Sequence, residues 1–424
     1  MRRSRGQSSE FIAAMTVLIV APYFPPDSNQ SALMYSGLAA DLASRGEDVT
    51  VITTEPHYAV CGKRRIGRPY REETWCGARI IRVYVPHLGR WSLWRRIVTL
   101  LCFNTLGALF LLFQRSPAAA VIPNPAFLSI GIAAVLSLRG IPIHFRIHDL
   151  YPEIAVRLGV VPPEGLAAHW IGGMERACIR RAARVSVVTE AFREHLVKRG
   201  VARNRTELIP DWVDTERIRV SPRCNAFSRE HGLDGQFVLM YGGNVGLSQR
   251  LDVLLDAAEI LQNSGTEGIR VLIIGGGAAK QRLMRVARDK LLRNVTFLPC
   301  QPAELLNEVY AACDAGFVSL MPGLSPEWCP AKVYTVMASG RPVLAAVDIP
   351  RSEVHNVVTN SGAGICVQAG DAHAVARAVL VLMADRAATA EFGRRGRLAA
   401  ERLYARQSCT RALHKTIQLA CRQV

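Results

Sequence analysis

A glycine-rich loop followed by a cation is the first candidate for chemistry in this sequence. Residues 241–250 read YGGNVGLSQR, so a short apolar strand runs into Gly243 and Asn244, with Arg250 six residues after Asn244. Glycines let backbone amides approach an oxyanion, a following helix adds positive potential, and a guanidinium binds phosphate in a two-pronged fashion. The spacing matches neither Walker A nor GxGxxG. The pattern indicates either a phosphate-binding turn or a bare glycine loop.

Two further loops carry residues of the same kind. Gly276 lies in a Gly-Gly-Gly run after the apolar segment RVLII, which indicates either a plain turn or an approach to a nucleotide base or ribose. The segment 325–343, SPEWCPAKVYTVMASGRPV, places Glu327 in a loop and Lys332 in the first turn of a predicted helix. A cation in that turn opposes the helix dipole, so we expect Lys332 to pair with an anionic ligand or with an acid elsewhere in the fold.

Polar residues also follow two predicted strands of the amino-terminal half. His148 and Asp149 come directly after IPIHFRI, and the loop PYFPPDSNQ after the first strand holds Asp27, Ser28 and Asn29. These three residues suit either the cap of the next helix or an acceptor-binding loop. The sequence contains no HExxH, DxD or GxSxG, so we expect neither a metal site nor a hydrolase elbow.

The elements that must position these residues alternate as short apolar strands and helices along almost the whole chain. This pattern is typical of parallel sheets covered on both faces. It predicts an α/β protein with two doubly wound, Rossmann-like domains, residues 15–211 and 212–385, preceded by an extension, 1–14, and followed by helices at 386–424 that pack back across the domains. Met15 is an alternative start. Two such domains would bring the carboxyl ends of both sheets to a central cleft, where ligands bind.

Composition narrows the class of partner. The chain has 424 residues, half of them hydrophobic, and a formal net charge of +17, which excludes a disordered chain and indicates an anionic partner. Nucleic acid is disfavoured because basic residues are not interleaved with stacking aromatics. Eleven cysteines without a CxxC pair indicate a reducing, cytosolic compartment.

An anionic membrane surface is a better candidate partner. Residues 61–96 carry ten Lys or Arg and two acids, and the following apolar segment 97–113 has 17 residues, short of the roughly 20 that a span needs. Tryptophans at 91 and 94 suit a headgroup interface. The apolar segment is either a buried helix, an interfacial helix or a span, and the basic cluster is either lipid-facing or an ordinary solvated loop.

The motifs together resemble a known family. PYFPPD, HDLYPE, YGGNVG, IGGG and PAKVYTVMASGRPVLA, in this order over roughly residues 15–400, resemble glycosyltransferase family 4, the retaining GT-B transferases, and especially the colanic-acid and O-antigen fucosamine-transferase type. The resemblance implies a nucleotide-diphosphate sugar held mostly by the carboxyl-terminal domain, an acceptor held by the amino-terminal domain, and no required metal or other cofactor.

Residue by residue, the match to the family pattern is uneven. The family's pair of diphosphate-binding cations corresponds to Asn244 and Arg250, so one charge remains. The Glu-x7-Glu pair corresponds to Glu327, near the donor sugar, and Thr335, in place of the acid that grips ribose. Lys332 would help Arg250 to bind the diphosphate. His148 and Asp149 match the family's cleft residues, with Tyr151 where a tryptophan is usual.

The resemblance therefore implies a glycosyltransferase that moves a sugar from a nucleotide sugar to a lipid-linked oligosaccharide in surface polysaccharide biosynthesis. It would work peripherally at the cytoplasmic face of the inner membrane. Two alternatives stay open: a degenerate, non-catalytic scaffold, motivated by Thr335, and a nucleotide-sugar 2-epimerase on the same fold.

Overall fold

The computed structural model describes residues 14–27, 29–56, 70–85, 93–157, 159, 161–324 and 328–422. By internal contacts the chain divides into two compact units. The first comprises residues 1–146, 178–184 and 414–424, and the second comprises residues 147–177 and 185–413.

The first sheet has eight strands in the order β3-β4-β2-β1-β5-β6-β7-β8. Strands β1, β2, β4, β5 and β6 pair in parallel with one another, as do β7 and β8. Their bounds are β1 (Thr16–Val20), β2 (Asp48–Thr54), β3 (Tyr70–Trp75), β4 (Ala78–Val83), β5 (Ala119–Pro123), β6 (Ile143–Ile147), β7 (Arg184–Val187) and β8 (Thr206–Leu208). Strands β1, β5 and β6 are almost wholly buried, which explains their unbroken apolar sequences.

Strand β3 departs from the predicted parallel arrangement and forms part of the predicted basic cluster. This edge strand, YREETW, runs antiparallel to β4. Arg79 is bonded twice to Glu72, and the buried Arg82 bonds to Glu73 and to the carbonyl of Thr54. These two arginines of the predicted cluster therefore have carboxylate partners, whereas the cluster residues at 63, 64, 65, 68 and 90 lie outside the described residues.

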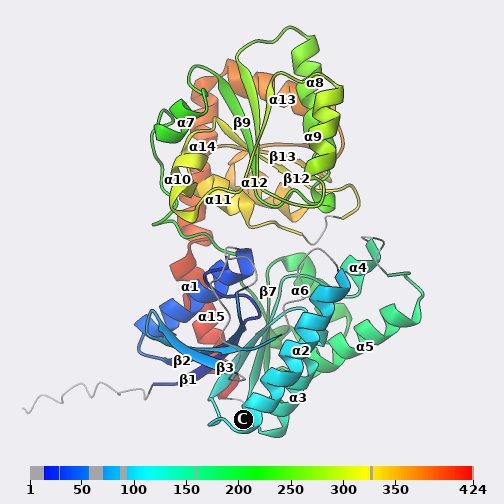
Figure 1. The fold of residues 1–424 in the computed structure, drawn as a ribbon, viewed down its shortest axis with the longest axis vertical. Helices are drawn as coiled ribbons and strands as arrows, with labels where there is room; N and C mark the ends of the chain where they lie inside the picture. Colours follow the sequence, from blue (N-terminus) through cyan, green and yellow to red (C-terminus); the bar gives the residue numbers. More distant parts are fainter. Residues whose placement is uncertain are drawn as a thin grey trace, which may run out of the picture. The chain divides into compact units, whose positions relative to one another are not determined.

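Helices connect the strands of this sheet (Figure 1). Their bounds are α1 (Gln30–Ser44), α2 (Leu93–Leu112), α3 (Ile130–Leu138), α4 (Glu153–Arg157), α5 (Leu166–Arg181) and α6 (Glu190–Lys198), with 3-10 turns at Ala126–Ser129 and Arg203–Arg205. The predicted apolar segment 97–113 forms most of α2. None of the helices in the described parts of the chain is long and apolar enough to cross a membrane.

The second sheet has six parallel strands in the order β11-β10-β9-β12-β13-β14. Their bounds are β9 (Phe237–Gly242), β10 (Ile269–Ile274), β11 (Val295–Leu298), β12 (Ala315–Ser319), β13 (Val343–Val347) and β14 (Gly364–Gln368). In strand order this is 3-2-1-4-5-6, so the direction of winding reverses between β9 and β12. The crevice outside the carboxyl ends of those two strands is where such sheets bind ligands.

Helices also connect the strands of the second sheet. Their bounds are α7 (Ala226–Glu230), α8 (Asp252–Asn263), α9 (Lys280–Asp289), α10 (Leu306–Ala311), α11 (Lys332–Ala338), α12 (Glu353–Ser361) and α13 (Ala372–Ala384), with 3-10 turns at Leu247–Gln249 and Ala303–Leu305. Helix α12 lies between β13 and β14. It is capped by the Ser352 side chain and closed by the left-handed Gly362.

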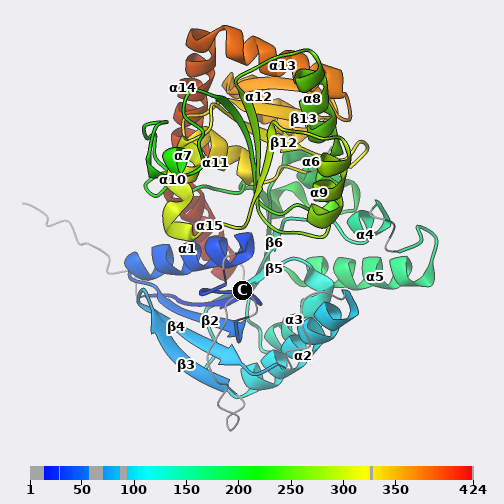
Figure 2. The same ribbon diagram turned by 45° about the horizontal axis from the view of Figure 1, so that its top comes forward.

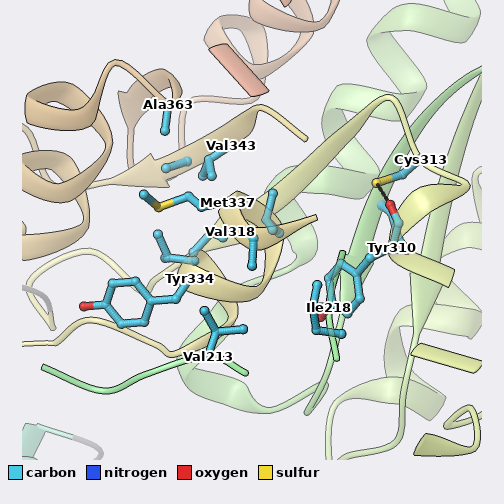
Figure 3. Packing of buried hydrophobic residues seen from close by; sticks show 14 of the residues in the cluster. Val213, Ile218, Tyr310, Cys313, Val318, Tyr334, Met337, Val343 and Ala363 are labelled. Atoms are coloured by element: carbon cyan, nitrogen blue, oxygen red, sulfur yellow. Dashed lines mark hydrogen bonds between the residues drawn. The ribbon is translucent and has the colours of Figure 1, made fainter. Parts of the chain in front are cut away.

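Helix α11 is anchored by its apolar face. Figure 3 shows Tyr334 and Met337 among the buried side chains of β12 and β13, including Val318 and Val343. Lys332 and Thr335 of the same helix are largely buried but remain partly accessible. Because the apolar face fixes the helix, those two polar residues are held in a defined direction.

The chain ends in two helices, α14 (Arg386–Leu403) and α15 (Arg406–Cys421). Helix α14 packs on α11 and α12, at a place where a Cβ on Gly393 would lie 2.1 Å from the carbonyl oxygen of Gly340. Within the second unit Arg406 pairs with Asp214 at 2.5 Å, and within the first unit His414 bonds to Glu47 at 2.7 Å. The prediction of an α/β fold with two mainly parallel, doubly wound sheets is confirmed.

Candidate functional site

The predicted glycine turn lies at the carboxyl end of β9, at the point where the second sheet reverses its winding. Gly243 has a φ of +130°, a conformation that side chains rarely permit. The loop after β10 packs directly against it, since a Cβ on Gly275 would lie 1.9 Å from the carbonyl oxygen of Gly243. The loop after β12 also reaches this turn, because Met321 donates its amide hydrogen to the carbonyl of Ser248 at 2.7 Å.

Three backbone amides between Gly243 and Gly246 are already engaged. Gly243 donates to Ile274, Val245 donates to Gly276, and Gly246 donates to the Gln249 side chain, all at 2.9 to 3.0 Å. Within the described residues, the Asn244 amide has no acceptor. Between Gly243 and Gly246 this leaves one amide, that of Asn244, for an anion, and the amides of Leu247 and Ser248 in the following 3-10 turn also have no acceptor among the described residues. Amides carry only partial charge, so tight binding of a diphosphate needs a further source of positive charge.

That source is Lys332, whose ammonium lies against the turn. A Cβ on Gly243 would be 3.3 Å from the Lys332 Nζ. Lys332 donates a hydrogen bond to the Tyr241 hydroxyl and lies 3.9 Å from the centre of the Tyr241 ring. The Tyr241 hydroxyl in turn donates to the Asn244 carbonyl at 2.6 Å. This chain of contacts holds the lysine and the exposed Asn244 amide at the same turn.

The Lys332 ammonium has no carboxylate partner among the described residues. Burial lowers the pKa of Lys332 to about 7, since desolvation penalises the charged form. Burial also raises the pKa of the Tyr241 hydroxyl, so Tyr241 is neutral and acts as a hydrogen-bonding group. We expected Lys332 to pair either with an anionic ligand or with an acid of the protein. This environment favours the ligand, because a bound anion would raise the pKa of Lys332 again and stabilise its charged form.

Arg250 and Thr335 are placed differently from each other. Arg250 is exposed, adopts a left-handed φ of +43°, and forms no side-chain hydrogen bond or ion pair with any residue the structure describes. Thr335 lies one helical turn after Lys332, and its hydroxyl bonds weakly to the Ala331 carbonyl at 3.4 Å. Arg250 is thus an available cation next to the turn, and Thr335 keeps capacity to accept or donate a further hydrogen bond.

Gly276 is exposed at the end of β10, between two glycines that must remain glycine. Gly277 has a φ of +155°, and its Cβ would lie 2.3 Å from the Val245 carbonyl oxygen. Lys280, at the start of α9, closes this loop by donating to the carbonyls of Gly275 and Leu298. The Gly275–Gly277 run is therefore a supporting turn that packs on the first glycine turn.

His148 and Asp149, just beyond β6, belong to a polar cluster of the second unit. His148 Nδ1 lies 3.1 Å from the carboxylate of Asp211. Burial raises the pKa of Asp149 to about 6; His148 opposes this rise, Asp211 adds to it, and a hydrogen bond from the Trp328 side chain again opposes it. A carboxyl group with this pKa can accept or give up a proton near neutral pH.

The remaining predicted residues are only partly described. Asn29 caps α1, accepting a hydrogen bond from the Ala32 amide at 2.8 Å, and Asp27 is buried. The cap explains Asn29 without a ligand. Ser28 and Glu327 lie outside the described residues, although Trp328, next to Glu327, contacts Asp149. The described residues contain no group of three His, Cys, Asp or Glu side chains arranged to hold a metal.

Two residues of the site were missed by sequence reasoning. Tyr241 looked like an ordinary apolar strand residue, yet its hydroxyl joins Lys332 to the glycine turn. Asp211 begins the polar segment after β8, and its position at the end of a strand was the available signal. No local pattern pairs Asp211 with His148, because the two are 63 positions apart.

Comparison with known proteins shows the family to which this chain belongs. The description "Glycosyl transferase 4-like domain" matches residues 34–212, and "Glycosyl transferases group 1" matches residues 236–385. WcaI of Escherichia coli (strain K12), named as a colanic acid biosynthesis glycosyl transferase, is 23% identical over 369 residues, which cover 84% of this chain and 88% of WcaI.

Two solved structures share the fold. Sucrose-phosphate synthase from Thermosynechococcus elongatus superimposes with a TM-score of 0.75 at 18% identity, covering 97% of this chain and all of that one. HepE from Anabaena, solved in complex with UDP-glucose, superimposes with a TM-score of 0.70 at 13% identity, covering 95% and 99% of the two chains. The chain belongs to the GT-B glycosyltransferases, with a glycosyl transferase 4-like amino-terminal part and a group 1 carboxyl-terminal part, and it is a glycosyltransferase.

Proposed function

We propose that this glycosyltransferase moves a sugar, with retention of anomeric configuration, from a nucleotide-diphosphate sugar to a lipid-linked oligosaccharide during surface polysaccharide assembly. The observation that carries the donor assignment is the Lys332 ammonium, which lies against the Gly243 turn at the switch point between β9 and β12. A nucleoside diphosphate is the anionic ligand that such a switch point takes in related folds. The name of WcaI supports the polysaccharide context, and HepE binds UDP-glucose.

In the proposed reaction the protein mainly supplies positive electrostatic potential. As the bond between the anomeric carbon and the diphosphate oxygen breaks, the electron pair moves to the diphosphate. Lys332, Arg250 and the Asn244 amide would stabilise that charge, which is larger in the transition state than in the ground state. The acceptor oxygen forms the new bond on the same face, and its proton passes to the leaving phosphate. No step requires a metal ion.

The other predicted residues take supporting roles in this proposal. Glu327 would bind the donor sugar hydroxyls, Thr335 the ribose, and Gly276 the edge of the nucleotide. His148 and Asp149 would orient the acceptor hydroxyl or share its proton; the His148–Asp211 pair fixes the imidazole for that task. The loop at Asp27, Ser28 and Asn29 would lie on the acceptor side. We place the enzyme peripherally on the cytoplasmic face of the inner membrane, where a lipid-linked acceptor and an anionic surface occur together.

Product analysis tests this function. Purified protein is incubated in EDTA with UDP-, GDP-, dTDP- and ADP-sugars and a lipid-linked oligosaccharide acceptor. We expect one donor to give a product with the donor's anomeric configuration, measured by NMR. Glu327→Gln should abolish turnover, while Glu304→Gln, at an exposed position, should not. A protein that supports polysaccharide assembly in cells, even as Glu327→Gln, yet never consumes a donor would instead be a scaffold. Conversion of the donor to its 2-epimer without an acceptor would indicate an epimerase.

A further inference from the structure

Helix α2 has one buried side and one exposed side. One side of the helix is buried: Phe103, Ala108 and Leu111 pack inside, and the Asn104 side chain accepts a hydrogen bond from the amide of Ile132 at 3.1 Å. Helix α3 lies alongside it, as Figure 2 and the first view both show. The opposite side of α2 is exposed.

The exposed side is almost entirely apolar. Positions 98, 101, 105, 109 and 112 fall within about 80° on a helical wheel, and only Thr105 among them is polar. The outward face, which we call the α2 face, comprises Val98, Leu101, Leu106, Leu109, Leu112 and Phe113, with exposed fractions from 37% to 85%. An ordinary surface helix carries charged residues on this side. Residues 97–113 contain none.

Two exposed apolar side chains lie at the carboxyl-terminal ends of α2 and α3 and enlarge the α2 face. The Arg139 guanidinium, just after α3, donates to the carbonyls of Leu111 and Gln114 at the end of α2. The two helices therefore end together, and Phe113 and Leu138, 85% and 87% exposed, emerge at the same end. Arg115 is exposed beside them, without a partner among the described residues.

The stretch of chain that contains α2 and α3 carries charge of one sign. From Thr74 to His148 the sequence has eight arginines and neither lysine, aspartate nor glutamate. Arg79 and Arg82 pair with glutamates that precede this stretch, and Arg146 is buried. Among the other arginines, Arg115 and Arg139 follow α2 and α3, and the sequence places Arg95 and Arg96 in the first turn of α2. Arg139 bonds to carbonyls and a hydroxyl, so its charge is not cancelled by a carboxylate in those contacts.

We propose that the α2 face is the surface by which the protein lies on an anionic phospholipid bilayer. This inference rests on the proposed function for its purpose, since a lipid-linked acceptor would lie in that bilayer. An apolar face between cationic ends matches an interfacial helix, whose side chains enter the acyl boundary while arginines remain with the lipid phosphates. A symmetric dimer through this face would bring arginines of two copies together and is less favourable.

Vesicle binding by the full-length protein tests the proposal. Wild type should sediment with vesicles of phosphatidylethanolamine and phosphatidylglycerol, and much less with phosphatidylcholine alone. Leu101→Glu/Leu109→Glu should lower the partition coefficient by at least about tenfold, since two half-exposed leucines are lost and two anions face anionic lipid. The matched control, Val381→Glu/Leu403→Glu, changes two residues of similar exposure on α13 and α14 and should bind like wild type.

Two further readouts keep the test decisive. If the α2 variant does not fold, hydrogen exchange of the wild type should still slow across residues 97–116 when anionic vesicles are added. Hydrolysis of the donor without lipid should be the same in the folded variant and wild type, which separates this inference from the proposed catalytic function. Unchanged vesicle binding by the variant, or a wild-type dimer that the variant dissolves while vesicle binding persists, would overturn the proposal.

Discussion

The pH dependence of donor binding follows from the environment of Lys332. Burial lowers the pKa of this lysine to about 7 in the ligand-free protein. Below pH 7 the ammonium is present and can bind a diphosphate. Above pH 7 the lysine loses its proton, and binding must either proceed without that charge or take up a proton from solution. Donor affinity should therefore fall as the pH rises through 7.

The magnitude follows from the protonated fraction. With a pKa of about 7, roughly half of the Lys332 side chains are protonated at pH 7 and about 1% at pH 9. If the protonated form alone binds tightly, affinity should fall by up to about 50-fold over that range. Arg250 and the Asn244 amide should limit this loss of affinity, because they still bind the diphosphate at high pH. At pH 7, binding should take up about half a proton for each nucleotide bound.

Isothermal titration calorimetry with the best-binding nucleoside diphosphate measures this effect. The range from pH 7 to 9 avoids the second ionisation of the terminal phosphate, which occurs near pH 6. Titration in two buffers with different ionisation enthalpies gives the proton uptake. Lys332→Arg should abolish the pH dependence because a guanidinium stays charged, and Lys332→Met should bind weakly at every pH. Equal pH profiles for wild type and Lys332→Arg would refute the assigned role of Lys332.

Three further predictions concern the residues around Lys332. Gly275→Ala should lower the free energy of unfolding in urea by about 3 kcal/mol or more, because its Cβ would lie 1.9 Å from a backbone oxygen at a φ of +142°. Gly276→Ala is the control, since its Cβ would meet its nearest neighbour at 3.8 Å. Equal stability of the two variants would contradict the geometry. Tyr241→Phe removes the acceptor of the Lys332 hydrogen bond and the donor to Asn244, so nucleotide affinity should fall by about 1 kcal/mol, which calorimetry would detect. Arg250→Ala should weaken nucleotide binding by about tenfold without lowering the melting temperature by more than a small amount, since its side chain forms no hydrogen bond or ion pair with the described residues and only a weak electrostatic interaction with Asp252. A clear loss of stability would show a structural role instead.

The fold was predictable where the sequence pattern and the burial pattern coincide. Strands such as β9 and β12 are almost entirely apolar because both faces of the sheet are covered, and such short apolar runs predict strands. Strand β3 was not predictable in this way. It is an exposed edge strand of charged residues, and pairing with β4 and contacts between its glutamates and arginines hold it in place. Helix α12 did offer signals, in Ser352 and Gly362, which an apolar-period search overlooks.

Some features of the candidate site were likewise predictable from the sequence, and others depend on tertiary structure. The glycine turn, Arg250 and Lys332 were predictable from the sequence. Glycines after an apolar strand favour a turn, and a lysine in the first turn of a helix is unusual because it opposes the helix dipole. The proximity of Lys332 to Gly243 was not, since 89 positions separate them and only the packing of α11 brings the ammonium to the turn. The pairing of His148 with Asp211 depends in the same way on tertiary structure. Type and spacing show which residues are available for chemistry, and the fold decides which of them meet.

A thermal-shift titration tests the central claim most directly. Wild type and Lys332→Met are melted in EDTA with UDP, GDP, dTDP and ADP. We expect one nucleotide, at about 100 times its Kd, to stabilise wild type by about 2.7 kcal/mol, seen as a clear rise in Tm. The rise should be much smaller for Lys332→Met. A Tm of wild type that none of the four nucleotides changes, or an equal rise for both proteins, would contradict a donor diphosphate site at the Gly243 turn.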